Sequence, residues 1–394
     1  MSSAEDCSTL SRNAMDYKTK LNALSASGNL RHISSVRHDG RWIWDGTHRM
    51  LNLSSNDYLG LASEPALVSE FLDTCPQSSR IFSSSSSRLL TGNFEATEEL
   101  EDLLARAYCR PAALLFNSGY HANTGILPAL AEKDCLILAD KLVHASIIDG
   151  MKLSPAPFLR FRHQDMEQLE RIVAKESQKY RLVFIVVESI YSMDGDVTDL
   201  RRLSALRKRY KNICLYVDEA HAIGVRGPSG LGITEEQGVI SDIDLLVGTF
   251  GKALSSMGAY LVCSQEIREY LVNTSRPLIF STALPPVQLA WTTFLFRRLP
   301  QWQARREHLS RISSQLADAL RGFGGERSAS HIVPFIVGES SACQLRAEML
   351  QRHGFYCLPV RPPTVPRGTS RIRFSLTASV QESEVEALID ALLR

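Results

Sequence analysis

The sequence lacks paired cysteines, a dominant charge and any long apolar run. Its eight cysteines are scattered and none forms a CxxC pair, so neither a disulfide framework nor a metal site is predicted. Forty-four basic residues face 43 acidic ones, which gives no electrostatic argument for nucleic acid or a membrane as a partner. No segment approaches the ~18–20 apolar residues of a membrane span, and residues 1–16 lack the apolar core of a signal peptide. A cytoplasmic protein is expected.

What the chain does contain is a regular alternation of strand-like and helix-like segments from about residue 95 onward. Helical patterns cover residues 165–179 and 200–210. Short, continuously apolar runs typical of buried strands lie at Ala113–Phe116, Leu136–Leu138, Leu182–Val187, Ile213–Val217, Leu245–Val247 and Ala259–Val262. Such strands alternating with helices predict an α/β fold with a largely parallel central sheet.

Changes of pattern divide the chain into three parts. Residues 1–50 form an N-terminal segment, 51–285 a large domain and 286–394 a C-terminal domain. The C-terminal domain opens with a long helical pattern over 287–322, with Pro300 as an interruption. The one low-complexity stretch is Ser83–Ser87, whose composition alone favours a flexible linker.

Polar side chains follow five of the predicted strands. They are Asn117-Ser118-Gly119-Tyr120, Asp140 with His144, Glu188 with Ser192, Asp218 with His221, and Thr249 with Lys252. In open α/β sheets ligands bind beyond the carboxyl ends of the strands, so these groups are expected to converge on one crevice. Taken singly, a strand-end aspartate is more often a helix cap than a catalyst, and a lone histidine is usually structural.

The set suits the chemistry of pyridoxal 5'-phosphate (PLP). Lys252 stands in GTFGKALSSMGAY, directly after an apolar strand and among small residues, where its amine can form a Schiff base. Asp218 would hold the protonated ring nitrogen, His221 would bond the phenolic oxygen, and His144 could stack on the ring. These positions predict that Lys252 acts through its amine, as the group that forms the Schiff base.

A phosphate site is predicted beside this ring site. The turn from strand to helix at Ser118-Gly119-Tyr120 offers backbone N–H groups at a helix N-terminus. Thr249 and the pair Ser281-Thr282 supply hydroxyls of the kind that such a cradle uses.

The lysine segment TFGKALSSMG at 249–258 resembles the lysine signature of the fold-type I, class II aminotransferase-like enzymes. Seven further motifs are similar to the α-oxoamine synthase family in order and spacing, and they cover the chain from about residue 30. They are LNLSSNDYLGL (51–61), LLFNSGYHAN (114–123), ADKLVHAS (139–146), VESIYSMDGD (187–196), VDEAHAIG (217–224), STALPP (281–286) and RPPTVPRGTSRIRFSLTA (361–378).

The resemblance implies the fold and the residue roles. The fold is α/β of PLP fold type I, with a mostly parallel seven-stranded sheet between helices and a smaller α+β C-terminal domain. Lys252, His144, Asp218 and His221 would be catalytic, and Lys252 would also move protons at the substrate Cα. The implied cofactor-binding residues are Ser118, Gly119, Tyr120, His144, Glu188, Ser192, Asp218, His221, Thr249, Lys252, Ser281 and Thr282. The implied substrate-binding residues are Arg31, Asn56, His144, Thr364 and Arg373.

The resemblance also implies a reaction and an assembly. RPPTVP (361–366) is most similar to the branch of the family that makes 8-amino-7-oxononanoate for biotin. The expected reaction is a decarboxylating condensation of L-alanine with a pimeloyl thioester of CoA or acyl carrier protein. The expected assembly is a homodimer in which Thr282 reaches the partner's phosphate site.

Several alternatives stay open at this point. The chain could be a glycine C-acetyltransferase, a long-chain acyl relative, an aminotransferase or a non-catalytic partner subunit, although such a subunit would be expected to lack the lysine. A nicotinamide-dependent dehydrogenase is discounted because no G-x-G-x-x-G follows an early strand. Locally, RPPTVP could be a polyproline II linker, Arg373 a surface arginine, and Thr282 the cap of a helix beginning near Val287.

Overall fold

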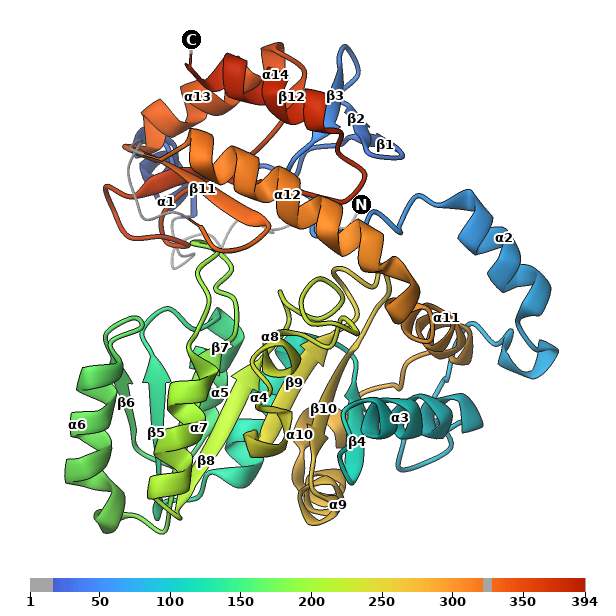
Figure 1. The fold of residues 1–394 in the computed structure, drawn as a ribbon, viewed down its shortest axis with the longest axis vertical. Helices are drawn as coiled ribbons and strands as arrows, with labels where there is room; N and C mark the ends of the chain where they lie inside the picture. Colours follow the sequence, from blue (N-terminus) through green and yellow to red (C-terminus); the bar gives the residue numbers. More distant parts are fainter. Residues whose placement is uncertain (1–16, 322–327, 394) are drawn as a thin grey trace, which may run out of the picture.

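The computed structural model describes residues 17–321 and 328–393, and Figure 1 shows two bodies, each built on β-sheet. The prediction for residues 1–16 lies outside the described residues. No helix among the described residues is both long and apolar enough to cross a membrane.

The larger body contains the predicted α/β sheet. Its seven strands lie in the order β4 (Ala112–Phe116), β10 (Ala259–Cys263), β9 (Leu245–Thr249), β8 (Ile213–Asp218), β7 (Leu182–Glu188), β5 (Cys135–Asp140) and β6 (Phe158–Phe161). All are parallel except β10, which is antiparallel to both of its neighbours. The predicted fold is therefore confirmed. The edge strand β6 was not predicted, because its exposed FLRF carries no continuous apolar run.

Helices cover both faces of this sheet, because successive strand residues point to opposite sides. In β4, Ala113 and Leu115 join one buried hydrophobic cluster, while Leu114 and Phe116 join another. The helices are α3 (Glu95–Ala107), α4 (Gly119–Leu130), α5 (Ala145–Leu153), α6 (Met166–Glu176), α7 (Leu200–Arg209), α8 (Ile233–Glu236), α9 (Gln265–Thr274) and α10 (Arg276–Ile279).

Two of these helices match the predicted patterns at 165–179 and 200–210. Asp165 caps α6 by accepting a hydrogen bond from the backbone N–H of Gln168, and Asp199 caps α7 in the same way. A single 3-10 turn, Ser177–Lys179, completes the first pattern.

The smaller body joins the two ends of the chain. One sheet contains β11 (Ile332–Gly338), β14 (Ser370–Ser375) and β13 (Pro359–Val360), and the other contains β1 (Arg37–Asp39), β2 (Trp42–Trp44), β3 (Arg49–Asn52) and β12 (Phe355–Tyr356). Helices α1 (Tyr17–Ala26), α13 (Ser340–Arg352) and α14 (Glu382–Leu393) lie with them in Figure 1. The domain boundaries stay predictions, and the parallel pairing of β3 with β12 places residues 49–52 with the C-terminal strands.

A helical segment connects the two bodies. After α2 (Pro65–Thr74) and a 3-10 turn at Gln77–Ser79, the chain reaches the large body, and it returns through α11 (Pro286–Phe296) and α12 (Gln303–Ala319). The 3-10 turn Leu299–Trp302 separates these last two helices and contains Pro300, so the predicted interruption is confirmed.

Two local alternatives are wrong. The serine run is anchored rather than free, because buried Ser84 donates its Oγ hydrogen to the carbonyl of Leu284 at 2.6 Å, and Ser86 accepts from the N–H of Ala283 at 2.9 Å. RPPTVP is a turn in which the N–H of Thr364 bonds the carbonyl of Arg361 at 3.1 Å. A polyproline II helix has no such internal hydrogen bond.

Candidate active site

A cavity of about 180 Å³ lies beyond the carboxyl ends of the parallel strands. Its lining consists of Gly119, Tyr120, Asn123, His144, Ser146, Glu188, Asp218, Ala220, His221, Thr249 and Lys252. Eight of these were predicted from strand ends, because parallel strands bring their carboxyl ends to one edge of the sheet. Asn123, Ser146 and Ala220 were not predicted.

Lys252 lies in the loop between β9 and β10 and turns its amine into this cavity. Its Nζ is 2.8 Å from Nε2 of His221. Burial, together with the Arg373 guanidinium, lowers the pKa of Lys252 to about 8, although Asp218 and Glu188 oppose the shift. A substantial neutral fraction of the amine is therefore present near pH 8, and the neutral amine is the nucleophile.

His221 follows β8 and makes a polar contact through each ring nitrogen. Its Nε2 faces Lys252, and its Nδ1 is 2.7 Å from the hydroxyl of Tyr58. Burial holds the pKa of His221 well below its ordinary value, and the nearby Lys252 and Arg373 cations act in the same direction. The imidazole is thus neutral at physiological pH.

Asp218, at the end of β8, is a buried carboxylate held from two sides. Its Oδ2 accepts from Nδ2 of Asn123 at 3.0 Å, and its Oδ1 accepts from the N–H of Ala220 at 2.9 Å. Asn123 is itself fixed, since its Oδ1 accepts from the hydroxyl of Tyr216. Asn123 lies in the quoted motif LLFNSGYHAN but faces the site from inside α4, so no strand-end signal could have identified it.

Glu188 and His144 form the remaining polar wall. Glu188 is buried at the end of β7, and its Oε1 has no hydrogen-bond partner among the residues that the structure describes. Burial and the nearby Asp218 charge raise the pKa of Glu188 well above its ordinary value. His144 caps α5, with its Nδ1 2.7 Å from Oγ of Ser146, and burial lowers the pKa of this imidazole.

The N-terminus of α4 provides the predicted anion site. Ser118 caps the helix by accepting from the N–H of His121 at 3.2 Å, and a Cβ added to Gly119 would meet no atom of the described residues within 4 Å beyond its own helix backbone and chain neighbours. Helix N-termini with open backbone N–H groups attract phosphate. Thr249, whose Oγ1 donates to the carbonyl of Gly258 at 3.0 Å, lies across the same cavity.

Arg373 comes from β14 of the smaller body. Both terminal nitrogens of its guanidinium lie 3.3 Å from Oδ1 of Asn56, and its Nε donates to the carbonyl of Ser192. The alternative of a plain surface arginine is wrong, because the side chain is half-buried between the two bodies. Tyr58 joins this group as well, 3.3 Å from Nη2 of Arg373, and it was not predicted.

Eight predicted residues do not line this cavity: Asn56, Ser118, Ser192 and Arg373, whose contacts are described above, and Arg31, Thr364, Ser281 and Thr282. Arg31 donates to Oγ1 of Thr364 at 2.9 Å, in the turn that follows β13. The side chain of Thr282 is exposed, and its carbonyl accepts from Nδ2 of Asn117 at 2.7 Å. Ser281 lies beside it. Thr282 does not cap a helix, since Pro285 is the N-cap of α11 and that helix has no side-chain cap bond.

These residues fit PLP. Such a cofactor needs an amine, a carboxylate for its ring nitrogen, a flat partner for its ring and a cradle for its phosphate. Lys252, Asp218, His144 and the N-terminus of α4 meet these needs around one cavity. The unpartnered Oε1 of Glu188 and the open space at Gly119 leave polar room for a bound group.

Comparisons with known proteins agree with this fit. The model of the family "Aminotransferase class I and II" matches residues 48–392. An 8-amino-7-oxononanoate synthase of Haemophilus ducreyi is 54% identical over 384 residues, covering 95% of this chain and 99% of the relative. A putative 8-amino-7-oxononanoate synthase of Pasteurella multocida is 54% identical over 378 residues, covering 95% and 98%.

Solved structures show the same fold. A serine palmitoyltransferase from S. paucimobilis with bound PLP–myriocin aldimine superposes with a TM-score of 0.86 at 28% identity, over 95% of each chain. An 8-amino-7-oxononanoate synthase from Francisella tularensis superposes with a TM-score of 0.71 at 27% identity, over 87% of this chain and 96% of that one. By its family match and its relatives, the chain belongs to the class I and II aminotransferase family.

Proposed function

We propose that the chain catalyses the PLP-dependent, decarboxylating condensation of L-alanine with a pimeloyl thioester. The products are 8-amino-7-oxononanoate, CO2 and the free thiol of CoA or an acyl carrier protein, in biotin biosynthesis. The observation that carries the proposal is the cavity in which Lys252, Asp218, His221 and His144 meet. Relatives that are 54% identical over nearly the whole chain bear the name of this synthase, which supports the same substrates here.

Four groups would hold the cofactor. Lys252 would carry it as a Schiff base, Asp218 would pair with its ring nitrogen, His144 would lie on its ring, and the N-terminus of α4 with Thr249 would receive the phosphate. When bound, PLP supplies an electron sink for the negative charge that develops at the substrate Cα. Because Asp218 is already held by Asn123 and Ala220, no reorganisation of the carboxylate is needed.

The chain's own residues then orient substrate and move its proton. Arg373 and Asn56 would receive the carboxylate of the amino acid, since a guanidinium presents parallel N–H donors to a carboxylate. Lys252 as a free amine, whose pKa is lowered by burial, would remove the proton from Cα and later return one. His221, being neutral, offers Lys252 a polar neighbour without adding positive charge.

A product assay tests the proposal. Purified protein is incubated with PLP, L-alanine and either pimeloyl-CoA or pimeloyl carrier protein, and mass spectrometry follows 8-amino-7-oxononanoate. We expect product with at least one pimeloyl carrier and none without a thioester. Faster turnover with glycine and acetyl-CoA, or with serine and palmitoyl-CoA, would contradict the proposal and favour another member of the family.

We also propose that the enzyme is a cytoplasmic homodimer whose partner supplies Thr282 to each phosphate site. Thr282 is exposed, and its segment is held rigidly by Asn117 and by the serine run. The neighbouring Phe280 exposes 70% of its surface, and Phe82 and Leu90, on either side of the serine run, expose 79% and 78%. Exposed apolar side chains that gather in a patch are typical of an interaction surface. A two-fold interface would place the same segment in both sites.

Mixing of inactive chains tests this assembly. Heterodimers of a Lys252→Ala chain and a Thr282→Ala chain would have one site with both defects and one with neither. Activity should then exceed that of either parent. If Thr282→Ala alone is impaired and mixed dimers form without recovering activity, the cross-subunit role is wrong.

A further inference from the structure

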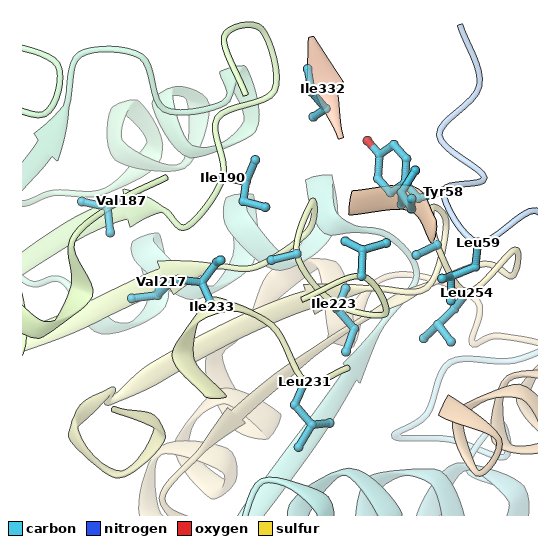
Figure 2. Packing of buried hydrophobic residues seen from close by; sticks show 14 of the residues in the cluster. Tyr58, Leu59, Val187, Ile190, Val217, Ile223, Leu231, Ile233, Leu254 and Ile332 are labelled. Carbon is cyan, nitrogen blue, oxygen red and sulfur yellow. The ribbon is translucent and has the colours of Figure 1, made fainter. Parts of the chain in front are cut away.

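Tyr58 lies where the proposed amino-acid site meets the catalytic lysine. Its side chain is fully buried in the hydrophobic cluster that also contains Ile223, Leu254 and Ile332, which Figure 2 labels around it. The ring of His331 packs edge-on against the phenol at 4.0 Å. These contacts come from both bodies, so the position of the hydroxyl is closely defined.

The hydroxyl of Tyr58 makes three hydrogen bonds. It is 2.7 Å from Nδ1 of His221, it donates to Oδ1 of Asn56 at 3.0 Å, and it accepts from Nη2 of Arg373 at 3.3 Å. Burial raises the pKa of Tyr58, so the group is a neutral phenol with a single proton to donate.

Counting protons decides which nitrogen of His221 carries its hydrogen. Amide oxygens and phenol oxygens both accept, so the contact between Tyr58 and Asn56 needs the phenol's only proton. The contact between Tyr58 and His221 must then be supplied by a proton on Nδ1. A neutral imidazole holds one such proton, which leaves a lone pair on Nε2, directed at Lys252.

The opposite arrangement satisfies fewer contacts. If Tyr58 donated to His221, the oxygens of Tyr58 and Asn56 would face each other at 3.0 Å without a proton between them. Nε2 would then carry a hydrogen pointing at Lys252, which opposes the ammonium form of the lysine. Asn56 Oδ1 would still accept from Arg373, but two acceptor oxygens in contact with no proton between them repel each other, so the first arrangement is favoured.

We propose that Tyr58 is a positioning residue that fixes His221 as the Nδ1-protonated tautomer and thereby presents a proton acceptor to Lys252. The same hydroxyl ties this tautomer to Asn56 and Arg373, where the amino-acid carboxylate is proposed to bind. The charged and titratable groups that face His221 are Lys252, Arg373, His331 and His144, together with Tyr58 itself. The kinetic consequence rests on the proposed function, whereas the tautomer does not.

The tautomer is tested directly by ¹⁵N NMR of histidine nitrogens in the full chain without added PLP. The signal of His221 is assigned by its loss in His221→Asn, since the chain has ten histidines. We expect a proton on Nδ1 and a bare Nε2 in the wild-type chain. In Tyr58→Phe the proton should redistribute between the two nitrogens. A bare Nδ1 in the wild-type chain, or an unchanged tautomer in Tyr58→Phe, would overturn the proposal.

Kinetics of the PLP-loaded enzyme supply the second readout. A placed general base contributes about 10²–10⁴-fold, so losing the fixed acceptor beside it is expected to lower kcat about tenfold. The pH dependence of kcat should shift as well, while KM for the thioester should not change. An unchanged pH dependence would also overturn the proposal.

Tyr108→Phe is the matched control. Tyr108 is also buried, and its hydroxyl likewise has close partners, Tyr260 at 2.6 Å and the carbonyl of Leu231 at 3.1 Å, but neither partner belongs to the candidate site. We expect this variant to keep the His221 tautomer and the wild-type pH dependence. Absence of synthase activity in the wild-type enzyme would remove the proposed function and leave the NMR test intact.

Discussion

Two histidines of the large body each follow a strand of the sheet and contact a polar group through each ring nitrogen, but their pKa values are shifted in opposite directions. His221 follows β8 and lies between an amine and a phenol, whereas His163 follows β6 and lies between two carboxylates, with Nδ1 2.9 Å from Asp140 and Nε2 2.8 Å from Asp196. Burial lowers the pKa of both rings. In His163, however, the bonds to the two aspartates overcome burial and raise the pKa to about 10.

The difference shows that the partners of a histidine, rather than its burial, decide its use. His163 is a fixed cation that joins the end of β5 to the segment 191–197, whose residues Ser192 and Asp194 hold Arg373 and Arg371. His221 is neutral and lies beside an amine whose pKa is close to physiological pH. His163 therefore stabilises the wall of the site, whereas His221 lies beside the lysine that is proposed to react.

Replacing the amine beside His221 should have the largest effect. Lys252→Ala removes the nucleophile and the proton carrier together, so turnover is expected to fall by at least ~10³-fold. The yellow colour and the borohydride-sensitive visible absorbance of the PLP-loaded protein should disappear with it. Wild-type turnover in this variant would exclude the Schiff-base assignment.

The carboxylate of the same cavity comes next. Asp218→Asn keeps the shape but removes the charge, and one of the donors from Asn123 and Ala220 would then face an amide N–H. We expect a loss of about 2–4 kcal/mol in the step that forms the Cα carbanion, with a smaller effect on PLP binding. Stopped-flow absorbance measures that step, and an unchanged rate would remove Asp218 from this role.

On the other side of the comparison, His163→Gln should affect stability rather than chemistry. The substitution leaves Asp140, which is 1% exposed, without its cationic partner. The free energy of unfolding is expected to fall by about 1–3 kcal/mol, measured by urea denaturation. A variant with full stability but lost activity would contradict the structural role of His163.

The smallest expected effect is the pH dependence of this stabilisation. The folded pKa of His163, about 10, lies above the ordinary value near 6.5, so its contribution is full below about pH 6.5 and is lost as the pH rises through about 10. Lys252, whose pKa is lowered to about 8, changes stability in the opposite direction between about pH 8 and 10.5. Lys252 is present in both wild type and His163→Gln, so its contribution drops out of the difference between their free energies of unfolding.

Urea denaturation at several pH values measures this difference. It should shrink steadily between about pH 6.5 and 10. A constant difference over that range would show that His163 is not held as a cation.

Local patterns predicted the strands and the strand-end groups of the site because both depend on nearby residues. An apolar run predicts a buried strand. Parallel pairing then places the polar residues that end neighbouring strands side by side at the same edge of the sheet, as for Glu188 and Asp218. Tyr58 could not be found in this way, since it lies before the sheet begins and reaches His221 only through the packing of the two bodies. The exposed edge strand β6 likewise carries no apolar signal.

The pairing of β3 with β12 has a consequence for biosynthesis. The ribosome synthesises the chain from its N-terminus. Every strand of the large sheet has therefore been made once residue 263 has been added. Residues 49–52, in contrast, must wait for Phe355–Tyr356 before their own sheet is complete. The large body can therefore fold during translation, while the closing of the small body, and with it the delivery of Arg373 to Asn56, comes only near the end of synthesis.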